Sequence, residues 1–155
     1  MAAVADAYIG AGRGDVFFFA FDTGREDDVS ACEMTRAFAT EKDRIKIVAH
    51  GENGEIIKAF SQCGKIVATR FHSAVLALKM GIDMYPVIYR DKMKNMLSDV
   101  GYTVKGCPID AVDVEGIKRF VLSKGTSFSL SADILSLAGR HAEILRSVLK
   151  ESETD

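Results

Sequence analysis

An arginine and a histidine stand two residues apart where an apolar strand is expected to meet an apolar helix. The stretch KIVATRFHSAVLALKMG, from Lys65 to Gly81, places Arg70 and His72 at that junction. The first turn of a helix has unpaired N–H groups that receive anions, and an arginine before it adds bidentate recognition of phosphate or carboxylate. A histidine, with an ordinary pKa of about 6.5, binds phosphate when charged or carries a proton. The pair therefore indicates an anion site; the simpler alternative is that Arg70 pairs with a carboxylate such as Asp91 and His72 only packs.

Further polar residues follow the other expected strands. Because ligands bind beyond the carboxyl ends of the strands in an open parallel sheet, the same edge adds five binding candidates, Asp22, His50, Ser73, Tyr89 and Lys92. Lys92 opens a helix, where the helix dipole disfavours a lysine, and this indicates an anion nearby. Asp22 and His50 are weaker candidates, because each could serve only to shape its loop.

The elements that must position these residues form a repeating pattern of strand and helix. We predict strands over Val16–Phe21, Ile45–Ala49, Lys65–Thr69, Met84–Tyr89 and, more weakly, Val104–Ile109. The predicted helices are Glu26–Thr40, Glu55–Cys63, His72–Met80, Lys92–Val100 and Val114–Ser123. Continuous apolar runs indicate strands covered on both faces, and the alternation predicts a Rossmann-like α/β fold with a parallel sheet flanked by helices. Pro86 lacks a backbone donor, which weakens the fourth strand or moves it to an edge of the sheet.

The length predicts one domain over residues 1–155. We divide it into an N-terminal extension, 1–14, a Rossmann-like core, 15–130, and a C-terminal amphipathic helix, 131–150. Ser131 offers a cap for this last helix, whose apolar stripe runs from Ile134 to Leu149.

Composition narrows the classes of function. The chain is 48% hydrophobic and 27% charged with a net charge of −2, which is typical of a soluble globular protein and disfavours nucleic acid as a partner. The scattered cysteines, Cys32, Cys63 and Cys107, lack metal-type spacing and suit a reducing compartment. The first residues do not resemble a signal peptide, and the apolar run DVFFFAFD is too short to span a membrane. We therefore expect a cytoplasmic protein with neither metal nor cofactor.

Several common motifs are missing from the sequence. It contains neither a Walker A loop nor G-x-S-x-G, and the glycine-rich IGAGRG precedes the first strand, whereas a dinucleotide-binding loop would follow one. A receiver domain would need a phosphorylatable aspartate after the third strand, where this chain has Arg70.

The stretch RFHSAVLALKMGIDMYPVIYRDKMKNMLSDVGY resembles the signature of the polysaccharide pyruvyl transferase family. That signature reads R-[LF]-H-[AS], an apolar helix, a glycine, and a strand that ends in Y-x-x-K. The matching positions, in register without gaps, are Arg70, His72, Gly81, Tyr89 and Lys92. The preceding SQCGKIVATR is similar to the family's helix and strand, whereas Asp83 stands where the family usually has proline.

The resemblance implies a transferase that moves a pyruvyl group from phosphoenolpyruvate to two hydroxyls of a sugar, forming a ketal in the synthesis of cell-surface polysaccharide. It implies a two-lobed GT-B-type enzyme whose C-terminal lobe holds the donor, and this chain resembles that lobe without the acceptor lobe. Arg70 and His72 would then be the catalytic residues. The partners would be phosphoenolpyruvate, a saccharide or lipid-linked saccharide acceptor, and an N-terminal lobe or a second copy of the chain.

Two other classes of function stay open. One is the donor-binding lobe of a nucleotide-sugar glycosyltransferase, for which Glu115 is a weak candidate to bind ribose. The other is a non-catalytic module that binds a phosphate or a sugar.

Overall fold

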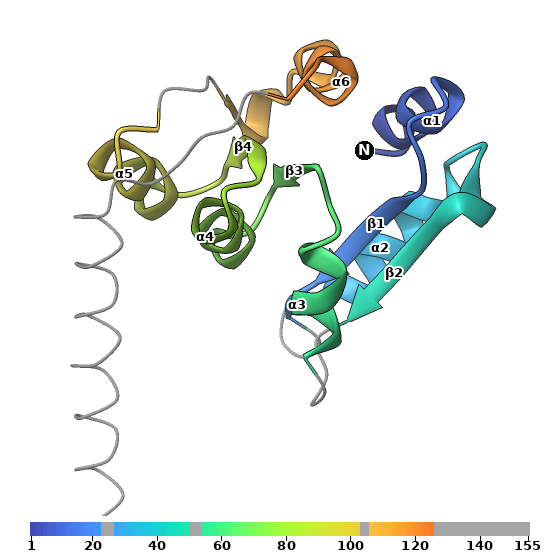
Figure 1. Cartoon of the computed structure of the whole chain (residues 1–155), viewed down its shortest axis with the longest axis horizontal. Helices are drawn as coiled ribbons and strands as arrows, with labels where there is room; N and C mark the ends of the chain where they lie inside the picture. The colour runs from blue at the N-terminus through green and yellow to red at the C-terminus, as the bar shows by residue number, and fades with distance from the viewer. Residues whose placement is uncertain (23–26, 50–53, 103–105, 126–155) are drawn as a thin grey trace, which may run out of the picture.

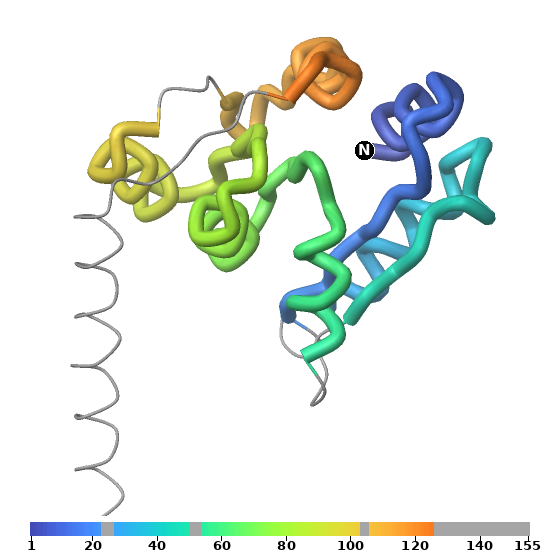
Figure 2. Tube along the Cα trace, in the orientation of Figure 1, coloured from blue at the N-terminus to red at the C-terminus, as the bar shows by residue number. Residues whose placement is uncertain are grey.

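The computed structural model describes residues 1–22, 27–49, 54–102 and 106–125. Helices and strands alternate along this part of the chain (Figures 1 and 2). The helices are α1 (Ala2–Gly10), α2 (Asp28–Ala37), α3 (Glu55–Phe60), α4 (Phe71–Met80), α5 (Asp91–Asp99) and α6 (Val114–Leu122), with short 3-10 turns at Lys42–Arg44 and Ile109–Ala111. The strands are β1 (Val16–Ala20), β2 (Ile45–Ala49), β3 (Lys65–Ala68), β4 (Asp83–Ile88) and β5 (Cys107–Pro108).

The described strands form two small parallel sheets. In one sheet β1 pairs with β2, and Val16 lies opposite Ile45. In the other sheet β4 lies between β3 and β5, with Lys65 opposite Asp83 and Val87 opposite Cys107. The predicted parallel α/β fold is therefore confirmed at this level, and it is compatible with a Rossmann-like fold. The strands do not form the single sheet that we expected, because β1 and β3 are not paired in the described structure.

Both sheets share the same two helical layers. On one side, Phe60 of α3 contacts Phe19 of β1 and belongs to the same core cluster as α4, α5 and Met84 of β4. On the other side, α1 packs against both halves: Val4 joins the cluster of α6 and β4, and Ile9 packs with Ile45 of β2. Figure 1 shows α1 beside α6 at one end of the molecule. The arrangement is a layer of strands between helices, divided between β1 and β3.

Pro86 does not place its strand at an edge, so that alternative is wrong. It is fully buried opposite Ala68, and pairing of β4 with β5 starts one residue later, at Val87. Gly106 lies directly against this proline, since a Cβ built on the glycine would come 2.2 Å from the Pro86 carbonyl oxygen. The missing donor is tolerated because pairing with β5 begins only after the proline.

The predicted helices and strands are observed with bounds that differ at their ends, and β2 has the predicted bounds. Of the weak fifth strand, Cys107–Pro108 is observed, and residues 104–105 lie outside the described residues. The helix predicted over Glu26–Thr40 is observed as Asp28–Ala37, and Glu26 also lies outside the described residues. The stretch 1–14, left without assigned structure by the sequence, contains α1. The helix predicted over 131–150 lies outside the described residues.

Substitution of Phe60 tests whether the packing of α3 holds the sheet of β1 and β2 against the sheet of β3, β4 and β5. Its side chain is fully buried and its ring centroid lies 5.1 Å from that of Phe19. We expect Phe60→Ala to lower the free energy of unfolding by about 3–5 kcal/mol, through lost burial and the cavity left behind. The matched control is Phe38→Ala, at a phenylalanine that is 82% exposed, for which we expect a change within about 0.5 kcal/mol. Urea denaturation of both variants measures this, and similar losses in the two would contradict the packing described.

Candidate functional site

The junction of β3 and α4 is held by hydrogen bonds within the chain. Arg70 is extended, with φ −117° and ψ 146°, and α4 begins at the next residue. The Arg70 N–H donates to Ser73 Oγ over 3.3 Å, and the same hydroxyl donates to the Arg70 carbonyl over 2.7 Å. Ser73 is buried, and both of these bonds fix the start of the helix. Its hydroxyl therefore has a structural role in the described conformation.

The Arg70 guanidinium forms an ion pair with Asp28, at the start of α2. Asp28 Oδ2 also accepts the backbone N–H groups of Phe21, at 3.1 Å, and Asp22, at 3.0 Å. The Asp28 N–H in turn donates to the Asp22 carbonyl over 2.8 Å. The Asp28 side chain is 10% exposed and that of Arg70 is 26% exposed. Arg70 does pair with a carboxylate, as the simpler alternative held, but the partner is Asp28 and not Asp91.

His72 and Lys92 lie on the exposed side of the same junction. The His72 ring stacks against Phe21, with centroids 6.4 Å apart and an interplanar angle of 26°. Lys92 Nζ lies 4.4 Å from the ring centroid of Phe71, the first residue of α4. The structure therefore brings an imidazole and an ammonium group to the start of α4. The contact with Phe71 also gives Lys92 a local reason to stand at the start of a helix, apart from any anion.

The other predicted site residues are Tyr89, Asp22 and His50. Tyr89 is half-buried after β4 and packs against the core, and its ring lies 5.7 Å from the Arg90 guanidinium carbon. Asp22 lies at the end of β1, where its backbone groups hold Asp28. His50 lies outside the described residues. Asp28 and Arg70 thus link the carboxyl ends of β1 and β3.

Asp28 was missed by the sequence reasoning, although the sequence contains a signal for it. Along α2, Asp28, Ala31, Cys32 and Thr35 recur at helical spacing, and all four line one cavity. Helical periodicity alone places an acid on that inward face. Its neighbour Asp27 has the expected surface role, because it caps the helix by accepting the Ser30 N–H over 3.2 Å.

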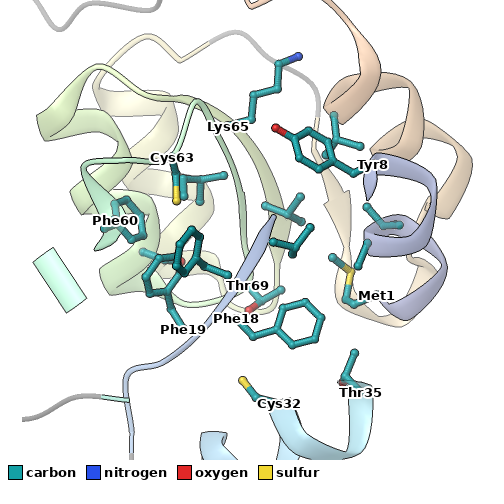
Figure 3. A pocket seen from close by; sticks show the side chains of 18 of the residues that line it. Met1, Tyr8, Phe18, Phe19, Cys32, Thr35, Phe60, Cys63, Lys65 and Thr69 are labelled. Atoms are coloured by element: carbon teal, nitrogen blue, oxygen red, sulfur yellow. The ribbon is translucent and has the colours of Figure 1, made fainter. Parts of the chain in front are cut away.

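A cavity of about 560 Å³ lies between β1 and β3 (Figure 3). Its lining includes Asp28, Arg70 and Ser73. Most of its lining is apolar. Phe19 lies beside Phe60, whereas Phe18 points toward Cys32 and Thr35 of α2. Burial raises the pKa of the Cys32 and Cys63 thiols, so both stay protonated at neutral pH.

The other basic residues that line the cavity, Lys65 and Arg13, form hydrogen bonds within the chain. Lys65 Nζ donates to the Ser123 carbonyl over 2.9 Å and to Ser123 Oγ over 2.6 Å, and burial lowers the pKa of Lys65. Arg13 Nη2 donates to the Leu122 carbonyl over 2.9 Å. Both cations hold the C-terminal end of α6, where carbonyl groups lack helical partners. Among the described residues at the predicted edge, the exposed basic side chains beside the anchored Arg70 are His72, Arg90 and Lys92.

The chemistry available to this arrangement is the binding of an anion and the transfer of a proton by His72. Among the described residues, histidine, cysteine and acidic side chains form no group able to hold a metal ion. None of the described helices is long and apolar enough to cross a membrane.

The Asp28–Arg70 pair should carry measurable coupling energy. In a double-mutant cycle of Asp28→Asn and Arg70→Met, we expect about 1–3 kcal/mol of coupling in the free energy of unfolding, because the pair is largely shielded from water. The exposed pair Glu115–Lys118, at 2.8 Å, is the control and should couple by less than about 0.5 kcal/mol. Equal coupling in the two cycles would show that Asp28 does not anchor Arg70.

In comparisons with protein-family models, with curated proteins and with solved structures, nothing matches this chain. The residues at the start of α4 and the sequence signature that contains them are what indicates a function for this chain.

Proposed function

We propose that this chain binds phosphoenolpyruvate as the donor lobe of a polysaccharide pyruvyl transferase of the GT-B type. The observation that supports this most directly is the grouping of His72, Lys92 and the anchored Arg70 at the first turn of α4. These residues also carry the sequence signature, so position in the fold and motif agree.

The charges of phosphoenolpyruvate suit this group. The donor carries a phosphate and a carboxylate, and the helix N-terminus, Lys92 and a charged His72 all favour negative charge. Arg70, whose orientation is fixed by Asp28, would contribute the positive charge of its guanidinium. In this proposal Asp28 is a positioning residue, which acts through Arg70.

The proposed reaction balances without an oxidant or reductant. A proton adds to the methylene carbon of phosphoenolpyruvate, two sugar oxygens form bonds to the former enol carbon, and the bond from that carbon to the phosphate oxygen breaks. The two hydroxyl protons are released, which replaces the proton taken up by carbon and leaves one for the departing phosphate or for solvent. His72 is the described residue suited to move one of these protons.

A non-catalytic anion-binding module is the second candidate, and the ion pair of Arg70 favours it. A guanidinium already bound to Asp28 has fewer free donors for a ligand. Such a module would bind phosphate and phosphoenolpyruvate alike and would need neither proton transfer nor an acceptor.

The test is calorimetric titration of the full chain with phosphoenolpyruvate, inorganic phosphate and UDP-glucose. We expect phosphoenolpyruvate to bind most tightly, because it presents two anionic groups, and Lys92→Ala to weaken its binding by about tenfold, or 1.4 kcal/mol. The matched control is Lys94→Ala, at another exposed lysine two residues after Lys92 in α5. It should leave the affinity unchanged.

Other results would redirect the proposal. Equal affinity for phosphate and phosphoenolpyruvate would favour the non-catalytic module, and tighter binding of UDP-glucose would favour a glycosyltransferase lobe. If Lys92→Ala and Lys94→Ala bind alike, the start of α4 is not the site.

A further inference from the structure

The cavity between the two sheets is bounded by strand edges. Four consecutive residues of β1, Val16 to Phe19, line it, as do Lys65, Ile66 and Val67 of β3. Consecutive side chains of a strand point to opposite faces of the sheet. Neighbouring residues therefore line the same cavity because the edge of their strand faces it. Their packing agrees, since Ile66 and Val67 belong to core clusters on opposite faces.

Each of these edges has backbone groups without a strand partner. Within the described residues, β1 pairs only with β2, and β3 pairs only with β4. In a parallel sheet each strand bonds its two neighbours with alternate residues, so half of the N–H and C=O groups of β1 and of β3 are directed toward the cavity. Backbone groups inside an apolar space are costly unless they are bonded.

We infer that the gap between β1 and β3 is a binding site for an extended segment of a partner polypeptide, which adds as a strand to both edges at once. The completed order would be β2, β1, the added strand, β3, β4 and β5. This inference is independent of the proposed donor site, because it uses the strand edges and not the start of α4.

The geometry favours a peptide over other occupants. A lipid or an aromatic molecule would fill the apolar volume but would leave the donors and acceptors of both edges unbonded, whereas an extended backbone satisfies both. The helical layers continue on both sides of the gap, so the segment should carry apolar side chains on both of its faces. Val67 is half-buried although helices cover its strand, as expected for a side chain at an unfilled gap.

The experiment measures amide hydrogen exchange of the full chain with and without an acetylated and amidated peptide of sequence KVIAVTK. We expect the amides of β1 and β3 that do not bond β2 or β4 to exchange rapidly in the free chain and to slow at least tenfold with the peptide. The control peptide is N-methylated at alternate residues, which removes its donors on one edge but keeps its side chains. It should bind at least tenfold more weakly.

A pair of variants places the binding in the gap. Val67→Lys puts a charge into the cavity and should reduce binding of the peptide at least tenfold, whereas Val75→Lys, on the exposed side of α4, should leave it unchanged. Equal binding by both variants would overturn the inference. So would equal binding of both peptides, which indicates a general apolar pocket, and so would slow exchange of the edge amides in the free chain, which indicates that β1 and β3 pair with each other. Absence of any protection by the peptide would overturn it as well.

Discussion

The carboxylate of Asp28 fixes the relative position of the two halves of this fold. It accepts two backbone N–H groups at the end of β1 and pairs with the guanidinium at the start of α4. Removing one member of a largely buried pair leaves an uncompensated charge, so each group depends on the others. Because Arg70 is held in this way, His72 two residues later comes to lie against Phe21. The candidate site therefore depends on an acid that belongs to a different strand–helix unit.

The opposite end of the cavity is closed by a different kind of contact. There α1 packs against α6, and the cations Arg13 and Lys65 bind carbonyl groups where α6 ends. Packing of α1 against α6 holds one end of the gap and a partly buried ion pair holds the other, and β1 and β3 are kept apart between them. A shared pair of helical layers can thus hold two sheets as one body without hydrogen bonds between the sheets.

The elements of this fold were largely predictable from local sequence, and their assembly was not. The apolar runs of β1 to β4 and the glycine that ends α4, Gly81 with φ 66°, mark their elements locally. Helix α1 was missed because the residues MAAVADAYIG are small and apolar with little polar contrast between its faces, so periodicity does not reveal it. That β1 and β3 lie in separate sheets depends on contacts between distant parts of the chain. The residue pattern within either strand does not predict it. The same holds for Arg70, since its partner lies 42 residues earlier among neighbouring acids.

The basic residues that line the cavity are held by contacts within the chain. Arg70, Lys65 and Arg13 all have acceptors within the chain, and each has a structural reason to be where it is. His72, Arg90 and Lys92 lie at the carboxyl ends of β3 and β4 and are exposed, so an anion bound to them is screened by salt and water. Charge stabilisation that accelerates a reaction needs a site from which water is excluded. In the proposed function, the described face would therefore bind the donor, and turnover would require a second surface that covers His72 and Lys92.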